Sequence, residues 1–183
     1  MMLIIRHSED SSESTYRHDS QLTKKGREIA KMRGRALIKK FGVPNLIYCS
    51  PFRRTKETLK LMLGANSTRI EYTTGLSRYF SERERRDPDV ASETLDAQIP
   101  LDEDNREFKV RVRQFAWNVL QSIQPGEIVW CITHSTVYKT IARIFEVEIP
   151  AYIKPNDHFI VYDSSSYKKW CPRCKVYHRR THN

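Results

Sequence analysis

The sequence predicts an α/β fold: a three-layer α/β/α sandwich with a mostly parallel central sheet, followed by a short basic C-terminal tail. Short continuous apolar runs alternate with longer segments whose apolar residues recur every three or four positions. Continuous apolar runs are typical of strands buried on both faces, and the longer pattern is typical of helices. Strands alternating with helices form a parallel sheet covered on both sides. For 183 residues we expect about one domain, at residues 1–163, with the tail at 164–183.

The first half of the chain contains three expected strands and two expected helices. The strands are predicted at residues 3–5, 46–49 and 70–72, and the polar residues 8–21 form a surface loop. The first helix runs from Thr23, a natural N-cap, to about Lys40, because Gly42 ends the pattern. Its predicted buried stripe consists of Ile29, Met32, Ala36, Leu37 and Phe41. The second helix covers residues 54–63 and buries Leu59, Met62 and Leu63.

The second half begins with a segment that has no clear period. Residues 77–104 are rich in charge, and we expect them to form a long excursion over one face of the domain. The three-and-four spacing then predicts a helix at 105–123, which Pro125-Gly126 ends. A central strand at 128–132, a helix from His134-Ser135 to Phe145 and a last strand at 159–162 complete the pattern.

Charge and composition limit the setting and the partners. The chain has 32 basic and 22 acidic residues, a net charge of +10, which favours anionic partners. No apolar run approaches the roughly 18 residues that span a bilayer, so we expect no membrane partner. Arg6 interrupts the apolar start, which argues against a secretory signal and for a cytoplasmic or nuclear protein. Cys49 and Cys131 lie inside apolar runs, so we expect reduced, buried thiols.

Basic and imidazole side chains follow three of the predicted strands. Arg6 and His7 come directly after the first strand, Arg54 follows the second, and His134 follows the strand at 128–132. Because the carboxyl ends of parallel strands meet at one edge of a sheet, we expect these four side chains to converge. Guanidinium forks and helix N-termini favour phosphate oxygens. The sequence therefore predicts a site for a dianionic phosphoryl group.

The motifs around these residues resemble those of the histidine phosphatase superfamily, which has the phosphoglycerate mutase-like fold. Arg6-His7-Ser8-Glu9 is similar to the family's Arg-His-Gly-Glu signature, and Leu22-Thr23-Lys24-Lys25-Gly26 to its Leu-Thr-x-x-Gly helix start. The residues from Ser50 to Thr58 resemble its Ser-Pro-Leu-x-Arg-Ala-x-x-Thr element, and Thr133-His134-Ser135 contains its second histidine. The resemblance covers about residues 3 to 163 and points to the small phosphatase branch.

The resemblance implies a covalent phosphatase mechanism without a catalytic cofactor. His7 would attack phosphorus and become phosphohistidine, while Arg6, Arg54 and His134 stabilise the transferring group and water completes hydrolysis. The implied activity is that of a histidine acid-type phosphatase acting on a phosphomonoester or phosphoramidate, carried by a small molecule or a phosphoprotein. Mutase activity is disfavoured, because only residues 77–104 could form the closed cap that a mutase needs.

Two departures from the family pattern leave an inactive binding module as the alternative. Ser8 replaces a glycine, and its side chain would either crowd the pocket or add a hydroxyl donor to the phosphate. Arg78 stands where many family members carry a glutamate that protonates the leaving group, and an arginine cannot do this at neutral pH. Glu82 is the first substitute candidate, with Asp87 and Asp89 behind it. Alternatively, Arg78 favours a multiply phosphorylated or acidic substrate, or the leaving group needs no acid, as in a phosphoramidate.

The basic tail contains a possible zinc knuckle. Cys171 and Cys174 form a Cys-x2-Cys pair, followed by His178 and His182, which a helix would place on one face. These four residues are the ligand types that tetrahedral structural zinc prefers. The alternative is a disordered tail with two unrelated thiols. Trp170 and Tyr177 among the basic residues would also suit nucleic acid or, by charge alone, an acidic protein.

Overall fold

The central sheet contains β1 (Met2–Arg6), β2 (Leu46–Cys49), β3 (Arg69–Tyr72), β4 (Val129–Thr133) and β5 (His158–Val161). Their order is β3-β2-β4-β1-β5, and only β5 runs antiparallel to its neighbour. The computed structural model describes residues 1–11, 20–80, 103–162, 167–171 and 176–179. The sheet is therefore mostly parallel, as the sequence predicted.

Four described helices cover this sheet: α1 (Lys24–Phe41), α2 (Arg53–Leu63), α5 (Asn105–Ser122) and α6 (Ser135–Ile144), with a short 3₁₀ turn, η1 (Thr74–Leu76). Thr23 caps α1, because its Oγ1 accepts a hydrogen bond from the backbone N–H of Gly26 at 2.9 Å. Asp104 and Glu107 form a capping box at the start of α5. The described helices are too short or too polar to cross a membrane.

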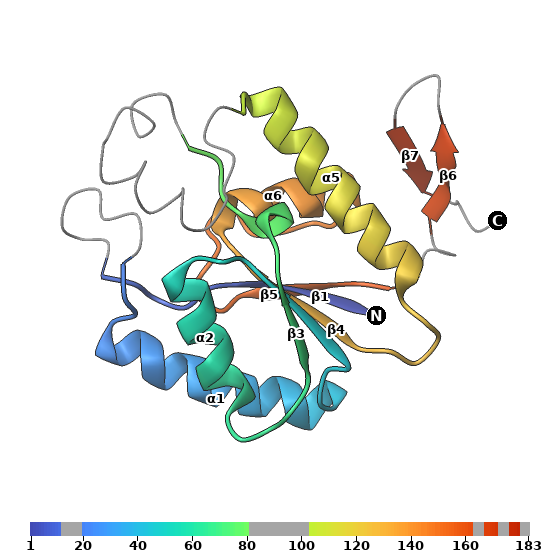
Figure 1. Cartoon of the computed structure of the whole chain (residues 1–183). Coiled ribbons are helices and arrows are strands. Elements are labelled where there is room, and N and C mark those ends of the chain that lie inside the picture. Colours follow the sequence, from blue (N-terminus) through green and yellow to red (C-terminus); the bar gives the residue numbers. More distant parts are fainter. Residues whose placement is uncertain (12–19, 81–102, 163–166, 172–175, 180–183) are drawn as a thin grey trace.

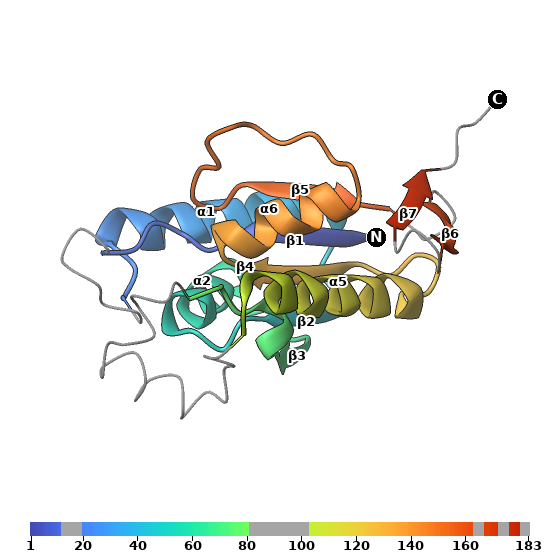
Figure 2. The ribbon, with the colours of Figure 1, turned by 90° about the horizontal axis from the view of Figure 1, so that it is seen from above.

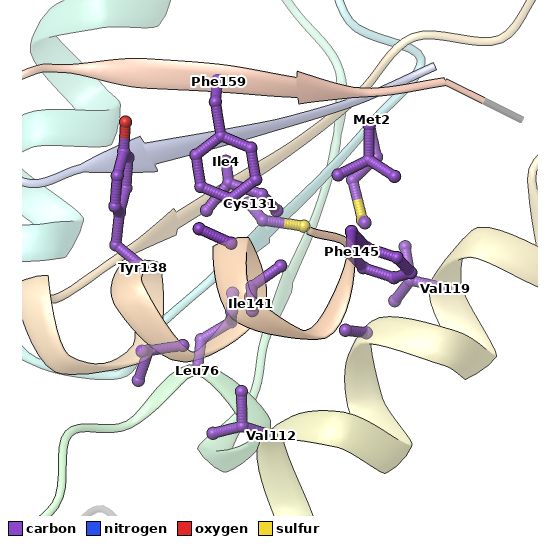
Figure 3. Close-up of a cluster of buried hydrophobic side chains, with 14 of the residues drawn as sticks. Met2, Ile4, Leu76, Val112, Val119, Cys131, Tyr138, Ile141, Phe145 and Phe159 are labelled. Carbon is purple, nitrogen blue, oxygen red and sulfur yellow. The ribbon is translucent and has the colours of Figure 1, made fainter. Parts of the chain in front are cut away.

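Two buried clusters divide the molecule into three layers. Alternate residues of a strand face opposite sides of a sheet, so Met2 and Ile4 join one cluster while Leu3 and Ile5 join the other. The first cluster lies between the sheet and α5 and α6, and Figure 3 shows its packing around Cys131. The second lies between the sheet and α1 and α2. Figures 1 and 2 show these helix pairs on opposite sides of the strands, which confirms the sandwich.

The predicted buried stripe of α1 is wrong in part. The buried residues of the helix are Gly26, Ala30, Gly34 and Leu37, whereas Met32 is 63% exposed. The helix packs against α2 so closely that a Cβ atom on Gly34 would lie 2.1 Å from the carbonyl oxygen of Met62. Of the predicted stripe, Leu37 is buried, and the other buried positions of α1 are small residues.

The strand register determines where the first and second histidines lie. Arg6 of β1 is paired with Thr133 of β4, and Cys49 of β2 is paired with Ile132. The residues that follow these positions leave three neighbouring parallel strands at the same edge. His7 and His134 are therefore placed side by side, and the N-termini of α2 and α6 begin at this edge.

The tail contains a β-hairpin that the sequence analysis did not predict. Strands β6 (Tyr167–Cys171) and β7 (Val176–Arg179) pair antiparallel, with Trp170 opposite Tyr177 and Cys171 opposite Val176. His178 lies in β7, so the prediction of a helix that aligns it with His182 is wrong at His178.

Candidate active site

The structure brings His7, Arg54 and His134 together at the carboxyl edge of the sheet. The two imidazole rings have centroids 5.3 Å apart. Nη2 of Arg54 lies 3.1 Å from Nδ1 of His134. The rings are almost fully buried, with His7 6% and His134 2% exposed, and Arg54 is buried beside them. Three of the four predicted residues thus form one contact group.

The hydrogen bonding of His7 leaves one ring nitrogen available as a nucleophile. Nδ1 lies 2.7 Å from the carbonyl oxygen of Ser8, which can only accept, so Nδ1 carries the proton. Burial, reinforced by the charge of Arg54, lowers the pKa of His7 to about 3. The ring is therefore neutral at physiological pH, with the lone pair on Nε2.

His134 is also neutral and is held at both nitrogens. An arginine only donates, so Arg54 donates to Nδ1, and Nε2 donates to Oγ of Ser50 at 2.9 Å. Burial lowers the pKa of His134 well below the ordinary value, and the charge of Arg54 acts in the same direction. Ser50 is thus a positioning residue for His134. The sequence motif contains Ser50 but does not predict its contact with this histidine.

Two further arginines make this edge strongly cationic. Arg6 and Arg78 both lie near enough to His134 to lower its pKa, and Nη1 of Arg6 donates to the carbonyl oxygen of Ile153. Within the described residues, the buried Nε of Arg6 has no hydrogen-bond acceptor. The guanidinium of Arg78 stacks over the Phe80 ring, 4.5 Å from its centroid. The site can therefore place several guanidinium donors around one anion.

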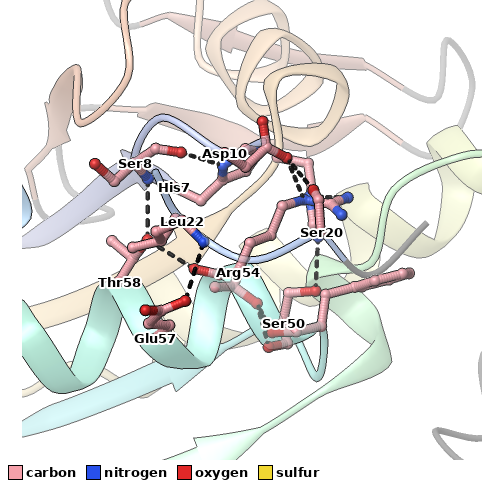
Figure 4. Close-up of polar contacts among 12 residues, drawn as sticks. His7, Ser8, Asp10, Ser20, Leu22, Ser50, Arg54, Glu57 and Thr58 are labelled. Carbon is pink, nitrogen blue, oxygen red and sulfur yellow. Dashed lines mark hydrogen bonds and ion pairs between the residues drawn. The ribbon is translucent and has the colours of Figure 1, made fainter. Parts of the chain in front are cut away.

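The expectation for Ser8 is wrong, because its hydroxyl is engaged within the protein. Oγ of Ser8 donates to the carbonyl oxygen of Gly26 at 2.6 Å and accepts from Nδ2 of Asn156 at 2.7 Å. The backbone N–H of Ser8 donates to Oγ1 of Thr58 at 3.0 Å (Figure 4). Ser8 therefore ties the loop after β1 to α1, α2 and the segment before β5, and it supports the position of His7.

Restoring the family glycine at this position should destabilise the protein. Ser8→Gly and Ser8→Ala remove the hydroxyl and leave buried partners unsatisfied, which costs about 2–3 kcal/mol of unfolding free energy. Chemical denaturation measures this loss, with the exposed Ser67→Ala as the matched control. Equal denaturation midpoints for Ser8→Gly, Ser8→Ala and wild type would show that the hydrogen bonds of the Ser8 hydroxyl contribute nothing to stability.

The neutral state of His7 should also make the fold sensitive to acid. Between pH 6.5 and about 3 the unfolded chain binds a proton at this residue and the folded chain does not. Stability should therefore fall as the pH falls, by about 1.4 kcal/mol per pH unit from this histidine. Unfolding free energies of wild type and His7→Asn at several pH values in this window measure the difference. If the unfolding free energies of the two proteins changed with pH in the same way, the lowered pKa of His7 would be contradicted.

The predicted general acids lie outside the described residues, but another carboxylate lies in the site. Glu82, Asp87 and Asp89 fall within residues 81–102, which the structure does not describe. Oδ2 of Asp10 lies 3.7 Å from Nε of Arg54. Asp10 is not among the residues predicted from the sequence, where its signal is a carboxylate three positions after His7 in the loop that leaves β1.

The zinc site in the tail remains a prediction from the sequence. Cys174 and His182 lie outside the described residues, and only backbone positions are described for Cys171 and His178. The described part of the chain contains no group of three or more potential metal ligands. We expect metal-replete protein to hold about one equivalent of zinc and Cys171→Ser to lose it. Metal analysis that finds no stoichiometric zinc, or no change in Cys171→Ser, would contradict this.

Fold and site together define an α/β protein with paired neutral histidines in an arginine-rich anion site. The family model of the histidine phosphatase superfamily (branch 1) matches residues 2–157. The chain therefore belongs to this superfamily.

Several solved structures share this fold. Bacillus stearothermophilus YhfR has 25% sequence identity and a TM-score of 0.62, with 97% of this chain and 94% of that chain covered. An ecdysone phosphate phosphatase from Bombix mori, in complex with tungstate, has 17% identity and a TM-score of 0.61, with 86% of each chain covered. The protein histidine phosphatase SixA with tungstate has 15% identity and a TM-score of 0.58, covering 90% and 89%. No curated protein sequence matches this chain.

Proposed function

We propose that this protein is a phosphatase that hydrolyses a phosphomonoester or phosphoramidate through a phosphohistidine intermediate on His7. The observation that carries the proposal is the hydrogen bond from Nδ1 of His7 to the carbonyl oxygen of Ser8, which leaves the Nε2 lone pair free. A neutral, buried imidazole beside several guanidinium groups combines a nucleophile with charge stabilisation for the transferring group.

The reaction proceeds in two displacements. Nε2 of His7 forms a bond to phosphorus as the bond to the leaving group breaks, and Arg6, Arg54 and His134 stabilise the charge on the phosphoryl oxygens. Water then attacks phosphorus, the P–N bond breaks, and phosphate leaves. Ser50 and Ser8 hold the two histidines in place through the contacts described above. No metal takes part in this proposal.

Arg78 favours substrates that carry extra negative charge or an easily displaced leaving group. It stands near His134, where it adds cationic character and cannot supply a proton. A phosphoramidate suits this arrangement because its nitrogen leaving group depends less on an acid. The named substrate class of SixA, a protein histidine phosphatase with a similar fold, is of this kind. We therefore place phosphorylated proteins and phosphoramidates beside small phosphomonoesters as substrates.

Phosphate release and anion binding, measured together, test this proposal. We expect wild type to release phosphate from p-nitrophenyl phosphate and from phosphoramidate, with vanadate as an inhibitor. Vanadate binding without release from either substrate would contradict the phosphatase and would favour an inactive phosphate-binding module.

A further inference from the structure

Asp10 is held against Arg54 by contacts on both its backbone and its side chain. Its backbone pairs with Leu22, and the N–H of Ser11 donates to the carbonyl oxygen of Gln21 at 2.9 Å. Oδ2 accepts a hydrogen bond from Oγ of Ser20 at 2.6 Å and lies 3.7 Å from Nε of Arg54 (Figure 4). The carboxylate is therefore fixed in one orientation at the edge of the anion site.

Arg54 connects this carboxylate with the reacting groups. Its guanidinium contacts His134 through Nη2 and faces Asp10 through Nε. Asp10 also lies close enough to His7 to oppose the lowering of its pKa. A phosphoryl group bound between Arg54, His134 and His7 would thus have the Asp10 carboxylate as a neighbour.

Asp10 is more exposed than Arg54 and the two histidines. The Arg54 side chain is 7% exposed and that of Asp10 is 14% exposed, while His134 is 2% exposed. In an in-line displacement the leaving group departs on the side opposite the nucleophile. Because Asp10 is more exposed than His7 and His134, a leaving group that departs towards solvent would pass Asp10.

The other carboxylates near this loop are engaged elsewhere. Glu9 accepts from Oγ1 of Thr23 at 3.0 Å and faces Lys25, at the start of α1. Glu57 accepts from the N–H of Leu22 and from Nε of Arg27. In the part of the chain that the structure describes, neither carboxylate contacts Arg54 or His134, so geometry distinguishes Asp10 from its neighbours.

We propose that Asp10 carries the proton in both steps of the reaction. In the first step the Asp10 carboxyl gives its proton to the leaving oxygen as the P–O bond breaks and the His7 Nε2–P bond forms. In the second step the Asp10 carboxylate takes a proton from the attacking water as the P–N bond breaks and its electron pair returns to Nε2. A bound phosphoryl anion favours the protonated carboxyl, because two negative charges repel each other. This inference rests on the proposed phosphatase function.

The dependence of the rate on the leaving group tests this role. Asp10→Asn, Glu9→Gln and wild type are compared on p-nitrophenyl phosphate, phenyl phosphate and an alkyl phosphate. The p-nitrophenolate ion leaves without protonation, whereas an alkoxide needs a proton. We expect Asp10→Asn to lower phosphoenzyme formation from the alkyl phosphate by about 10²–10⁴-fold and from p-nitrophenyl phosphate by less than about tenfold. Glu9→Gln should follow wild type on all three substrates.

Several results would overturn the assignment. If Asp10→Asn lowered the rate of phosphoenzyme formation equally on all three substrates, Asp10 would act only through Arg54. A leaving-group-dependent loss in Glu82→Gln, with Asp10→Asn unaffected, would assign the acid to Glu82. Retained vanadate binding by Asp10→Asn establishes that this variant is folded. Failure of the phosphatase proposal itself would appear differently, as absent turnover in wild type.

Discussion

His7→Asn should lower kcat/KM for p-nitrophenyl phosphate by about 10⁴-fold or more, because the residue that forms the covalent intermediate is lost. Asparagine can still donate to the carbonyl oxygen of Ser8, as Nδ1 of His7 does, so the variant separates nucleophilicity from structure. Arg6 and Arg54 remain in place to bind an anion. Steady-state kinetics and vanadate titration measure the two properties separately.

The matched control for this variant is His158→Asn. His158 lies in β5, the edge strand beside β1, where its ring faces Phe41 of α1, and its pKa is also lowered by burial. We expect its kcat/KM to stay within about twofold of wild type, because its ring packs against Phe41 of α1. Turnover by His7→Asn at a rate near that of wild type would show that another group attacks phosphorus.

Arg54→Met should lower kcat/KM by about 10²–10³-fold, the usual cost of removing one donor that stabilises transition-state charge. The side chain contacts His134 and Asp10, so its loss removes charge and disturbs both partners. Arg53→Met is the matched control, because Arg53 is the exposed residue before it in the same helix. We expect less than about a threefold change for Arg53→Met with a small substrate.

A conservative variant, Arg54→Lys, separates an effect on the reaction from an effect on protein stability. Arg54→Lys retains the positive charge but loses the forked geometry, so it should fall between wild type and Arg54→Met. Thermal unfolding of all three variants checks that each is folded. Equal kinetic losses for Arg53→Met and Arg54→Met would mean that general positive charge, and no specific contact, supports the reaction.

The convergence of the site residues could be predicted from the sequence because it follows from topology. Parallel strands bring their carboxyl ends to one edge, so residues that follow continuous apolar runs become neighbours whatever their separation along the chain. The pairing of Arg6 with Thr133 fulfils this expectation and brings His7 beside His134. Strands, helices and the three-layer arrangement follow from the same periodicities.

Contacts between particular side chains could not be predicted in this way. Ser8 bonds to Asn156, 148 positions away in the chain, and no local pattern records that pairing. Which face of α1 is packed depends on how closely α2 approaches Gly34. The spacing of apolar residues in the sequence does not reveal this distance. In the sequence Asp10 is one of several polar residues in a predicted loop, because its contact with Arg54 forms only when the chain folds.

The most direct test of the covalent mechanism is a rapid-quench experiment with a substrate whose phosphorus is radioactively labelled. We expect label to appear on wild-type protein within one turnover, to survive base, to be lost in acid, and to map to His7. His7→Asn should remain unlabelled while His158→Asn labels normally. Turnover of the substrate by wild type without any labelled protein would contradict a phosphohistidine intermediate and would require direct attack by water.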